Sequence, residues 1–139
     1  TQAGMLIKIK LYTVPGQVAH DSTRKAVLSR ADGVVFVADS QINQKVNNAT
    51  SFENLADNAN KVGLNFERLS LVIQYNKRDL SDDNITLMPI EQMEHDLNRQ
   101  MKVPSFPGSA LTGKGVGKTL NACLKLLLKS LQNELNLGG

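Results

Sequence analysis

Two short apolar runs separated by a helical pattern limit the possible folds of this chain more than any other feature. Residues 33–40 read GVVFVADS and residues 69–76 read LSLVIQYN, and both runs are rich in apolar and β-branched side chains. Continuous apolar runs of this length are typical of strands in a parallel sheet that helices cover on both faces. The sequence therefore predicts two buried strands in the centre of an α/β fold.

The segments around these runs complete an alternating pattern. Residues 5–14 (MLIKIKLYTV) alternate apolar and charged side chains in their middle, which predicts a half-exposed strand. Residues 103–110 (VPSFPGSA) predict a weaker strand that prolines interrupt. Apolar side chains at helical spacing predict four helices, over residues 22–29, 46–62, 89–101 and 116–135. Strands that alternate with helices predict a single α/β domain with a largely parallel sheet.

Length and composition fit one soluble domain. The chain has 139 residues, of which 41% are hydrophobic and 21% are charged. No apolar run is long enough to span a bilayer, and the last residues, NLGG, contain no cysteine for prenylation. We therefore expect no membrane anchor. The single cysteine, Cys123, fits a reducing cytoplasm, and its leucine neighbours at helical spacing predict a buried side chain.

The charged residues give no sign of a nucleic-acid partner or of a metal site. The basic side chains are scattered and are not interleaved with aromatic ones, which argues against nucleic-acid binding. His20 and His95 are too isolated in the sequence to suggest a metal site. Four lysines share one side of the last predicted helix, as on a solvated face: Lys114, Lys118, Lys125 and Lys129.

Polar clusters follow three of the predicted strands. Residues 13–17 (TVPGQ) follow the first strand, residues 76–79 (NKRD) the third, and residues 109–113 (SALTG) the fourth. In parallel α/β sheets, ligands bind at loops that leave the carboxyl ends of the strands. The agreement among three strands predicts a ligand site at this edge of the sheet.

The pattern Asn76-Lys77-x-Asp79 is suited to reading a guanine base. The Asp79 carboxylate can accept hydrogen bonds from the N1–H and the exocyclic amine of guanine, a pair that adenine does not offer. Asn76 can bond the base or loop atoms through its amide, and the stem of Lys77 can lie flat over the ring. A backbone N–H of the segment that begins with Ser109 and Ala110 can donate to guanine O6. The position of the pattern directly after a buried strand gives it more weight than its three residues alone.

The cluster TVPGQ is suited to contact phosphate. Gly16 lets the backbone approach a γ-phosphate and present its N–H, and Gln17 can orient an attacking water. On its own, the cluster is more typical of a simple Pro-Gly turn.

Together these motifs resemble those of the Ras-like small GTPases, in particular the MglA type of the bacterial gliding-motility and polarity branch. The resemblance is carried by LYTVPGQV, DGVVFVADSQ and VIQYNKRDL, and it covers almost the whole chain. It implies a Ras-like P-loop NTPase fold, which is a doubly wound, mostly parallel sheet with helices on both faces. It also implies that GTP or GDP binds with Mg²⁺, and that Thr13 stands where most members have a magnesium-shell aspartate.

The resemblance assigns a role to each cluster. Gly16 would meet the γ-phosphate and Gln17 would be the catalytic residue that positions water. Guanine would be held by Asn76, Lys77, Asp79, Ser109 and Ala110. The implied function is a cytoplasmic guanine-nucleotide switch that hydrolyses GTP and binds a Roadblock-fold GTPase-activating protein and effector proteins. A degenerate, non-hydrolysing GTPase-like module for protein interaction is the alternative, and the presence of Gln17 with the whole base-reading set favours the switch.

The family's phosphate loop has no counterpart in this sequence. The resemblance begins at the family's third strand, so we expect residues 1–139 to be a partial small-GTPase domain, N-terminally incomplete and inactive alone. Residues 113–119 (GKGVGKT) resemble a phosphate loop, but only three residues separate Gly113 from Gly117 where the loop needs four. We therefore expect a glycine-rich start of the last helix there.

Overall fold

The computed structural model describes Tyr12 and residues 21–138. The strands are β1 (Gly33–Asp39), β2 (Ser70–Asn76) and β3 (Ser105–Pro107). The α-helices are α1 (Asp21–Leu28), α2 (Lys45–Lys61), α3 (Ile90–Met93) and α4 (Val116–Gly138). Short 3-10 turns span Ile42–Gln44, Phe66–Arg68 and Arg78–Asp83, and a π-helical turn spans Glu94–Asn98.

The described strands form one parallel sheet in the order β1-β2-β3. The pairing of β1 with β2 runs from Gly33 beside Ser70 to Asp39 beside Asn76. The largely parallel sheet that the alternating pattern predicted is therefore confirmed. The strand predicted over residues 5–14 lies outside the described residues, except for Tyr12.

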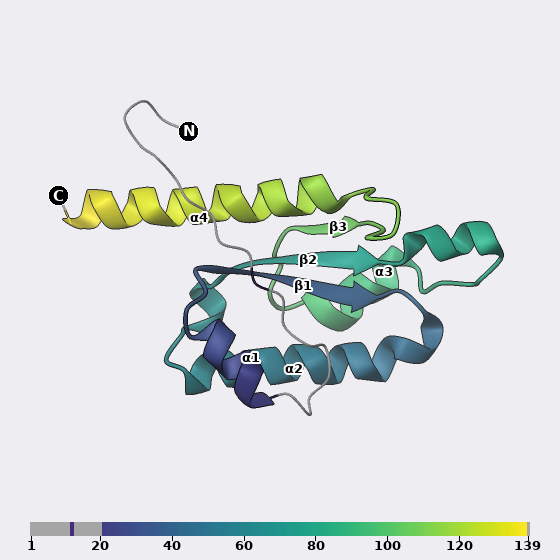
Figure 1. The fold of residues 1–139 in the computed structure, drawn as a ribbon, viewed down its shortest axis with the longest axis horizontal. Helices are drawn as coiled ribbons and strands as arrows, with labels where there is room; N and C mark the ends of the chain where they lie inside the picture. The colour runs from purple at the N-terminus through teal and green to yellow at the C-terminus, as the bar shows by residue number, and fades with distance from the viewer. Residues whose placement is uncertain (1–11, 13–20, 139) are drawn as a thin grey trace.

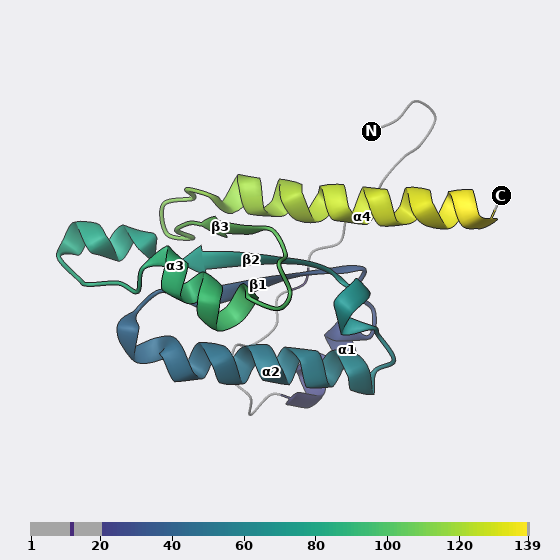
Figure 2. The same cartoon turned by 180° about the vertical axis from the view of Figure 1, so that it is seen from behind.

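Helices cover both faces of this sheet (Figure 1). Helix α4 lies along one face, whereas α1, α2 and α3 lie on the other, and the view from behind shows the same two layers (Figure 2). Each connection between neighbouring parallel strands passes through helical segments, as parallel pairing requires. This arrangement is that of a doubly wound α/β domain.

Strand β2 forms the centre of the core, as its apolar run predicted. Its residues from Ser70 to Tyr75 are all buried, because helices pack on both of its faces. Beside β2, three aromatic rings connect β1, α2 and the 3-10 turn that begins at Phe66. They belong to Phe36, Phe52 and Phe66. Their centroids lie 5.0 Å and 5.7 Å apart in edge-to-face contacts, which is a favoured aromatic geometry.

Strand β1 differs from the prediction that both of its faces would be buried. Phe36 and Ala38 point into the core, but the side chain of Val37 is 53% exposed. Helix α4 packs closely at the start of β1, where a Cβ on Gly33 would lie 3.1 Å from Leu127. In the described part of the chain, β1 pairs with β2 alone, so its other edge and the later part of one face have less cover.

The helix predicted over residues 89–101 is also different. Helix α3 ends at Met93, and the chain continues as a π-helical turn from Glu94 to Asn98. Both of these polar side chains bond inward: Tyr75 donates to Glu94, and the Asn98 amide donates to the Val103 carbonyl at 2.8 Å. Glu94 and Asn98 are four residues apart and bond on the same side, and the π-helical turn between them departs from the α-helical pattern that the sequence predicted.

Helix α4 agrees with its sequence pattern. Lys118, Lys125 and Lys129 are exposed, as is Lys114 just before the helix, so the predicted solvated face is confirmed. Cys123 is buried, and burial raises the pKa of its thiol, which makes it a core residue and a poor nucleophile. None of the described helices combines the length and apolar character needed to cross a bilayer.

Candidate functional site

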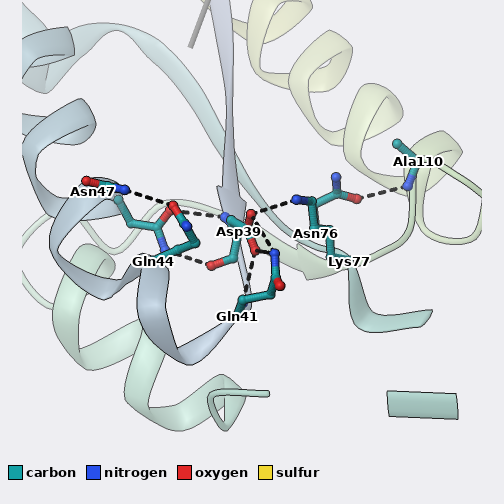
Figure 3. Close-up of polar contacts among 8 residues, drawn as sticks. Asp39, Gln41, Gln44, Asn47, Asn76, Lys77 and Ala110 are labelled. Atoms are coloured by element: carbon teal, nitrogen blue, oxygen red, sulfur yellow. Dashed lines mark hydrogen bonds and ion pairs between the residues drawn. The ribbon is translucent and has the colours of Figure 1, made fainter. Parts of the chain in front are cut away.

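The predicted base-reading clusters meet at the carboxyl edge of the sheet (Figure 3). Asn76 is the last residue of β2, and Ser109 and Ala110 follow β3 closely. The parallel sheet brings the two segments together because the carboxyl ends of its strands lie at one edge. The third cluster, with Thr13, Gly16 and Gln17, lies outside the described residues.

Direct hydrogen bonds join the two segments that are predicted to read the base. The Ala110 N–H donates to Asn76 Oδ1 at 2.9 Å, across a separation of 34 residues. The Arg78 N–H donates to the Gly108 carbonyl at 3.1 Å, and Gln74 Nε2 donates to Asn76 Oδ1 at 3.2 Å. The side chain of Asn76 therefore fixes the loop after β3 to the end of β2 and the turn that follows it.

The loop after β3 uses most of its own polar groups internally. The Ser109 N–H donates to the Lys114 carbonyl at 2.8 Å, and its buried hydroxyl accepts from the Thr112 N–H at 3.2 Å. Ala110 donates to Asn76, whereas the N–H of Leu111 donates no hydrogen bond within the described residues. In this conformation Ser109 and Ala110 shape the loop, and Leu111 carries the N–H that is open to an outside acceptor.

The turn after β2 carries Asp79, which has no partner in the part of the chain that the structure describes. Lys77 has a φ of 68°, a left-handed conformation that turns the chain sharply from β2 into the 3-10 turn from Arg78 to Asp83. Asp79 lies in the first turn of that segment and is half-buried. Its carboxylate makes no hydrogen bond or ion pair to the described residues, so both of its oxygens can accept from a ligand.

Lys77 contacts Asp39, a residue to which the sequence motifs assigned no role. Its Nζ lies 2.8 Å from Oδ2 of Asp39, the last residue of β1 (Figure 3). Asp39 lies near the end of an apolar run that predicts a strand, so its place at the carboxyl edge of the sheet could have been inferred from the sequence. The contact itself depends on the pairing of Asp39 with Asn76 across β1 and β2, which the motifs do not show.

The glycine-rich segment before α4 packs as part of the fold, as predicted. Helix α4 begins at Val116, and the Thr119 side chain is 1% exposed, with its hydroxyl donating to the Gly115 carbonyl at 2.8 Å. Gly115 has a φ of +80°, and a Cβ there would lie 2.3 Å from the Pro107 carbonyl oxygen. Because Thr119 is buried and the segment rests on the end of β3, this stretch forms no phosphate cradle.

The described residues also provide no metal site. No group of three or more His, Cys, Asp or Glu side chains converges in the part of the chain that the structure describes. The side chain of His95 is exposed. Thr13, the position at which the resemblance bears on Mg²⁺, is not among the described residues.

A parallel sheet with helices on both faces and an Asn-Lys-x-Asp turn at the end of its central strand is the arrangement of a Ras-like α/β domain. The chain is 44% identical over 129 residues to the Mutual gliding-motility protein MglA of Myxococcus xanthus (strain DK1622). This similarity covers 93% of the chain and 64% of the relative. No family model matches the chain. With this identity over almost its whole length, the chain is a homologue of this MglA protein, of which it spans less than two thirds.

Proposed function

We propose that the full-length protein is a guanine-nucleotide-binding switch of the gliding-motility and polarity type, which binds GTP and hydrolyses it to GDP. The described residues form the part that reads the base. Because the chain spans 64% of the length of its relative, the activity is proposed for the whole protein.

The hydrogen bond between Asn76 and Ala110 supports this function most directly. It joins two segments that are distant in sequence into one preformed edge, beside which the Asp79 carboxylate has no partner among the described residues. A pocket that is formed before the ligand arrives loses less conformational entropy on binding. The same bond is difficult to explain as a requirement of the core, because Ala110 is exposed.

Within this pocket the roles follow from donor and acceptor chemistry. Asp79 accepts from the N1–H and amine of guanine, the stem of Lys77 lies along the ring, and Asn76 holds the loop of Ser109 and Ala110. The N–H that reads O6 comes from this loop, and Leu111 offers one without opening the bond to Asn76.

The phosphate end of the nucleotide concerns residues outside the described part. We propose that Gly16 contacts the γ-phosphate and that Gln17 positions the attacking water. Mg²⁺ would accompany the nucleotide and neutralise phosphate charge. A Roadblock-fold activator and effector proteins are the proposed partners, and the segment from Val18 to Leu28 is the proposed switch that they read.

Replacement of Asp79 with asparagine tests the base assignment. An amide offers one acceptor where the carboxylate offers two, so GDP binding should weaken by about 2 to 4 kcal/mol. Xanthosine diphosphate has a carbonyl where guanine has its amine, so the variant should bind it more tightly than the wild type does. Titration of the full-length protein with both nucleotides measures this change in the relative affinity for GDP and xanthosine diphosphate.

Asp82→Asn is the matched control, because Asp82 is an exposed carboxylate in the same 3-10 turn. It should leave both affinities unchanged. If Asp79→Asn keeps the wild-type affinity for GDP and gains none for xanthosine diphosphate, Asp79 does not read the base.

A further inference from the structure

Asp39 lies beside the base-reading turn, and the roles assigned so far do not use it. In the register of the sheet it pairs with Asn76, so it shares the carboxyl edge with the Asn-Lys-x-Asp turn. Figure 3 shows its carboxylate turned toward Lys77, with Oδ2 2.8 Å from Nζ. This ion pair connects the end of β1 to the turn that follows β2.

Several hydrogen bonds hold Asp39 in place. Asn48 of α2, which is 8% exposed, donates to the Asp39 carbonyl at 2.8 Å and accepts from its N–H at 3.1 Å. The Gln41 N–H donates to Asp39 Oδ1 at 3.0 Å, and Gln41 Nε2 lies 3.2 Å from each carboxylate oxygen. Because both the backbone and the carboxylate are held, the negative charge has a defined position.

These contacts also keep the carboxylate ionised. Burial opposes ionisation, but hydrogen bonds from Lys77 and Gln41 outweigh it and hold the pKa of Asp39 below its ordinary value. The pair is therefore charged at neutral pH. Its side chains are 46% exposed for Lys77 and 23% exposed for Asp39, so water and salt weaken the attraction without removing it.

Lys77 needs such a partner if its stem is to form one wall of a pocket. A lysine side chain is a flexible chain of four carbons and has considerable rotamer entropy when it is unpaired. An ion pair at its tip restricts the stem before a ligand binds, so less entropy remains to be lost on binding.

We propose that Asp39 is a positioning residue of the base pocket, which holds the Lys77 ammonium so that the Lys77 stem lies along the face of a bound purine. This inference rests on the proposed function. Asp39 itself does not touch the base. The loss of Asp39 should therefore weaken the binding of different purine nucleotides by the same factor. The loss of Asp79 should instead change the preference of the protein among these nucleotides.

A double-mutant cycle on the full-length protein tests this role. Asp39→Asn should lower the affinity for GDP about fivefold, which is the size expected for a partly exposed ion pair. It should lower the affinity for inosine diphosphate by the same factor. Lys77→Ala should weaken GDP at least as much. The double variant should bind no more weakly than Lys77→Ala alone, because Asp39 acts through Lys77. Asp57→Asn, at an exposed carboxylate of α2, should change none of these affinities.

The outcomes separate positioning from a general structural role. The proposal is contradicted if Asp39→Asn binds GDP with the wild-type affinity. It is also contradicted if this change lowers the affinity for GDP by the same factor in the Lys77→Ala background. If Asp39→Asn does not fold, as judged by its melting curve, Gln41→Ala replaces it. That variant loosens the carboxylate and should give a smaller loss, again absent in the Lys77→Ala background, and an additive loss would contradict the proposal.

The cycle also distinguishes this inference from the proposed function. A wild-type protein that does not bind GDP would overturn both. A wild-type protein that binds GDP, together with an Asp39→Asn variant of equal affinity, would overturn the role of Asp39 alone.

Discussion

Replacement of Glu94 with alanine should lower the free energy of unfolding by about 2 to 4 kcal/mol. The Glu94 carboxylate accepts from the buried Tyr75 hydroxyl and from the Ser105 hydroxyl, both at 2.5 Å, and from the Asn98 amide at 3.2 Å. Its removal leaves these donors without their acceptor in the contact between the π-helical turn and the sheet. Urea denaturation followed by circular dichroism measures the loss.

Glu91→Ala is the matched control, because Glu91 is exposed one turn earlier in the same helical segment. It should change the free energy of unfolding by less than about 0.5 kcal/mol. Equal losses for the two variants would mean that the Glu94 network contributes no more than an ordinary surface carboxylate.

The same network makes the effect of Glu94 depend on pH. Burial opposes its ionisation, but hydrogen bonds from Ser105, Tyr75 and Asn98 hold the pKa of Glu94 below its ordinary value of 4.5. A carboxyl whose pKa is lowered by folding contributes stability above its unfolded pKa, and this contribution disappears as the pH falls through its folded pKa. The stability difference between the wild type and Glu94→Gln should therefore be constant near neutral pH and should shrink only below about pH 4.5.

Replacement of Gln17 with leucine should slow GTP hydrolysis by the full-length protein by about a hundredfold or more, to a background rate. Leucine has no group that can orient the attacking water, and its size is close to that of glutamine. Binding of the proposed Roadblock-fold partner in the GTP state should remain, because we expect water positioning and partner recognition to use different atoms. Single-turnover hydrolysis and partner affinity in both nucleotide states measure the two effects separately.

Gln132→Leu, the same change on the exposed side of α4, is the control and should hydrolyse GTP at the wild-type rate. Hydrolysis by Gln17→Leu within a few-fold of wild type would remove Gln17 from the mechanism. Equal partner affinity in the GDP and GTP states would contradict a nucleotide-dependent switch and would favour a protein-interaction module.

The sequence was sufficient to predict the elements that hold the base-reading segments. The run from Leu69 to Asn76 is short, mostly apolar and followed by a polar cluster, so the buried strand and the polar turn at its end could both be located. The glycine-rich stretch before α4 was also interpreted correctly as the start of that helix, because its glycine spacing differs from that of a phosphate loop and an amphipathic helix follows it.

Contacts between distant segments could not be predicted. The ion pair between Asp39 and Lys77 depends on the register of two strands, and the bond between Asn76 and Ala110 depends on how two loops meet. The π-helical turn at Glu94 departs from the period that identifies helices. The exposure of Val37 depends on which strands and helices lie beside β1, which its apolar neighbours do not reveal.

The relative affinity of the purified full-length protein for GDP and ADP tests the central claim most directly. Asp79 offers two acceptors to a base edge, which match the two donors of guanine and meet only one suitable group on adenine. Titration with fluorescent GDP and competition by unlabelled GDP or ADP should show a preference for GDP of at least about a hundredfold. Equal competition by the two nucleotides, or no binding of GDP at all, would contradict the account.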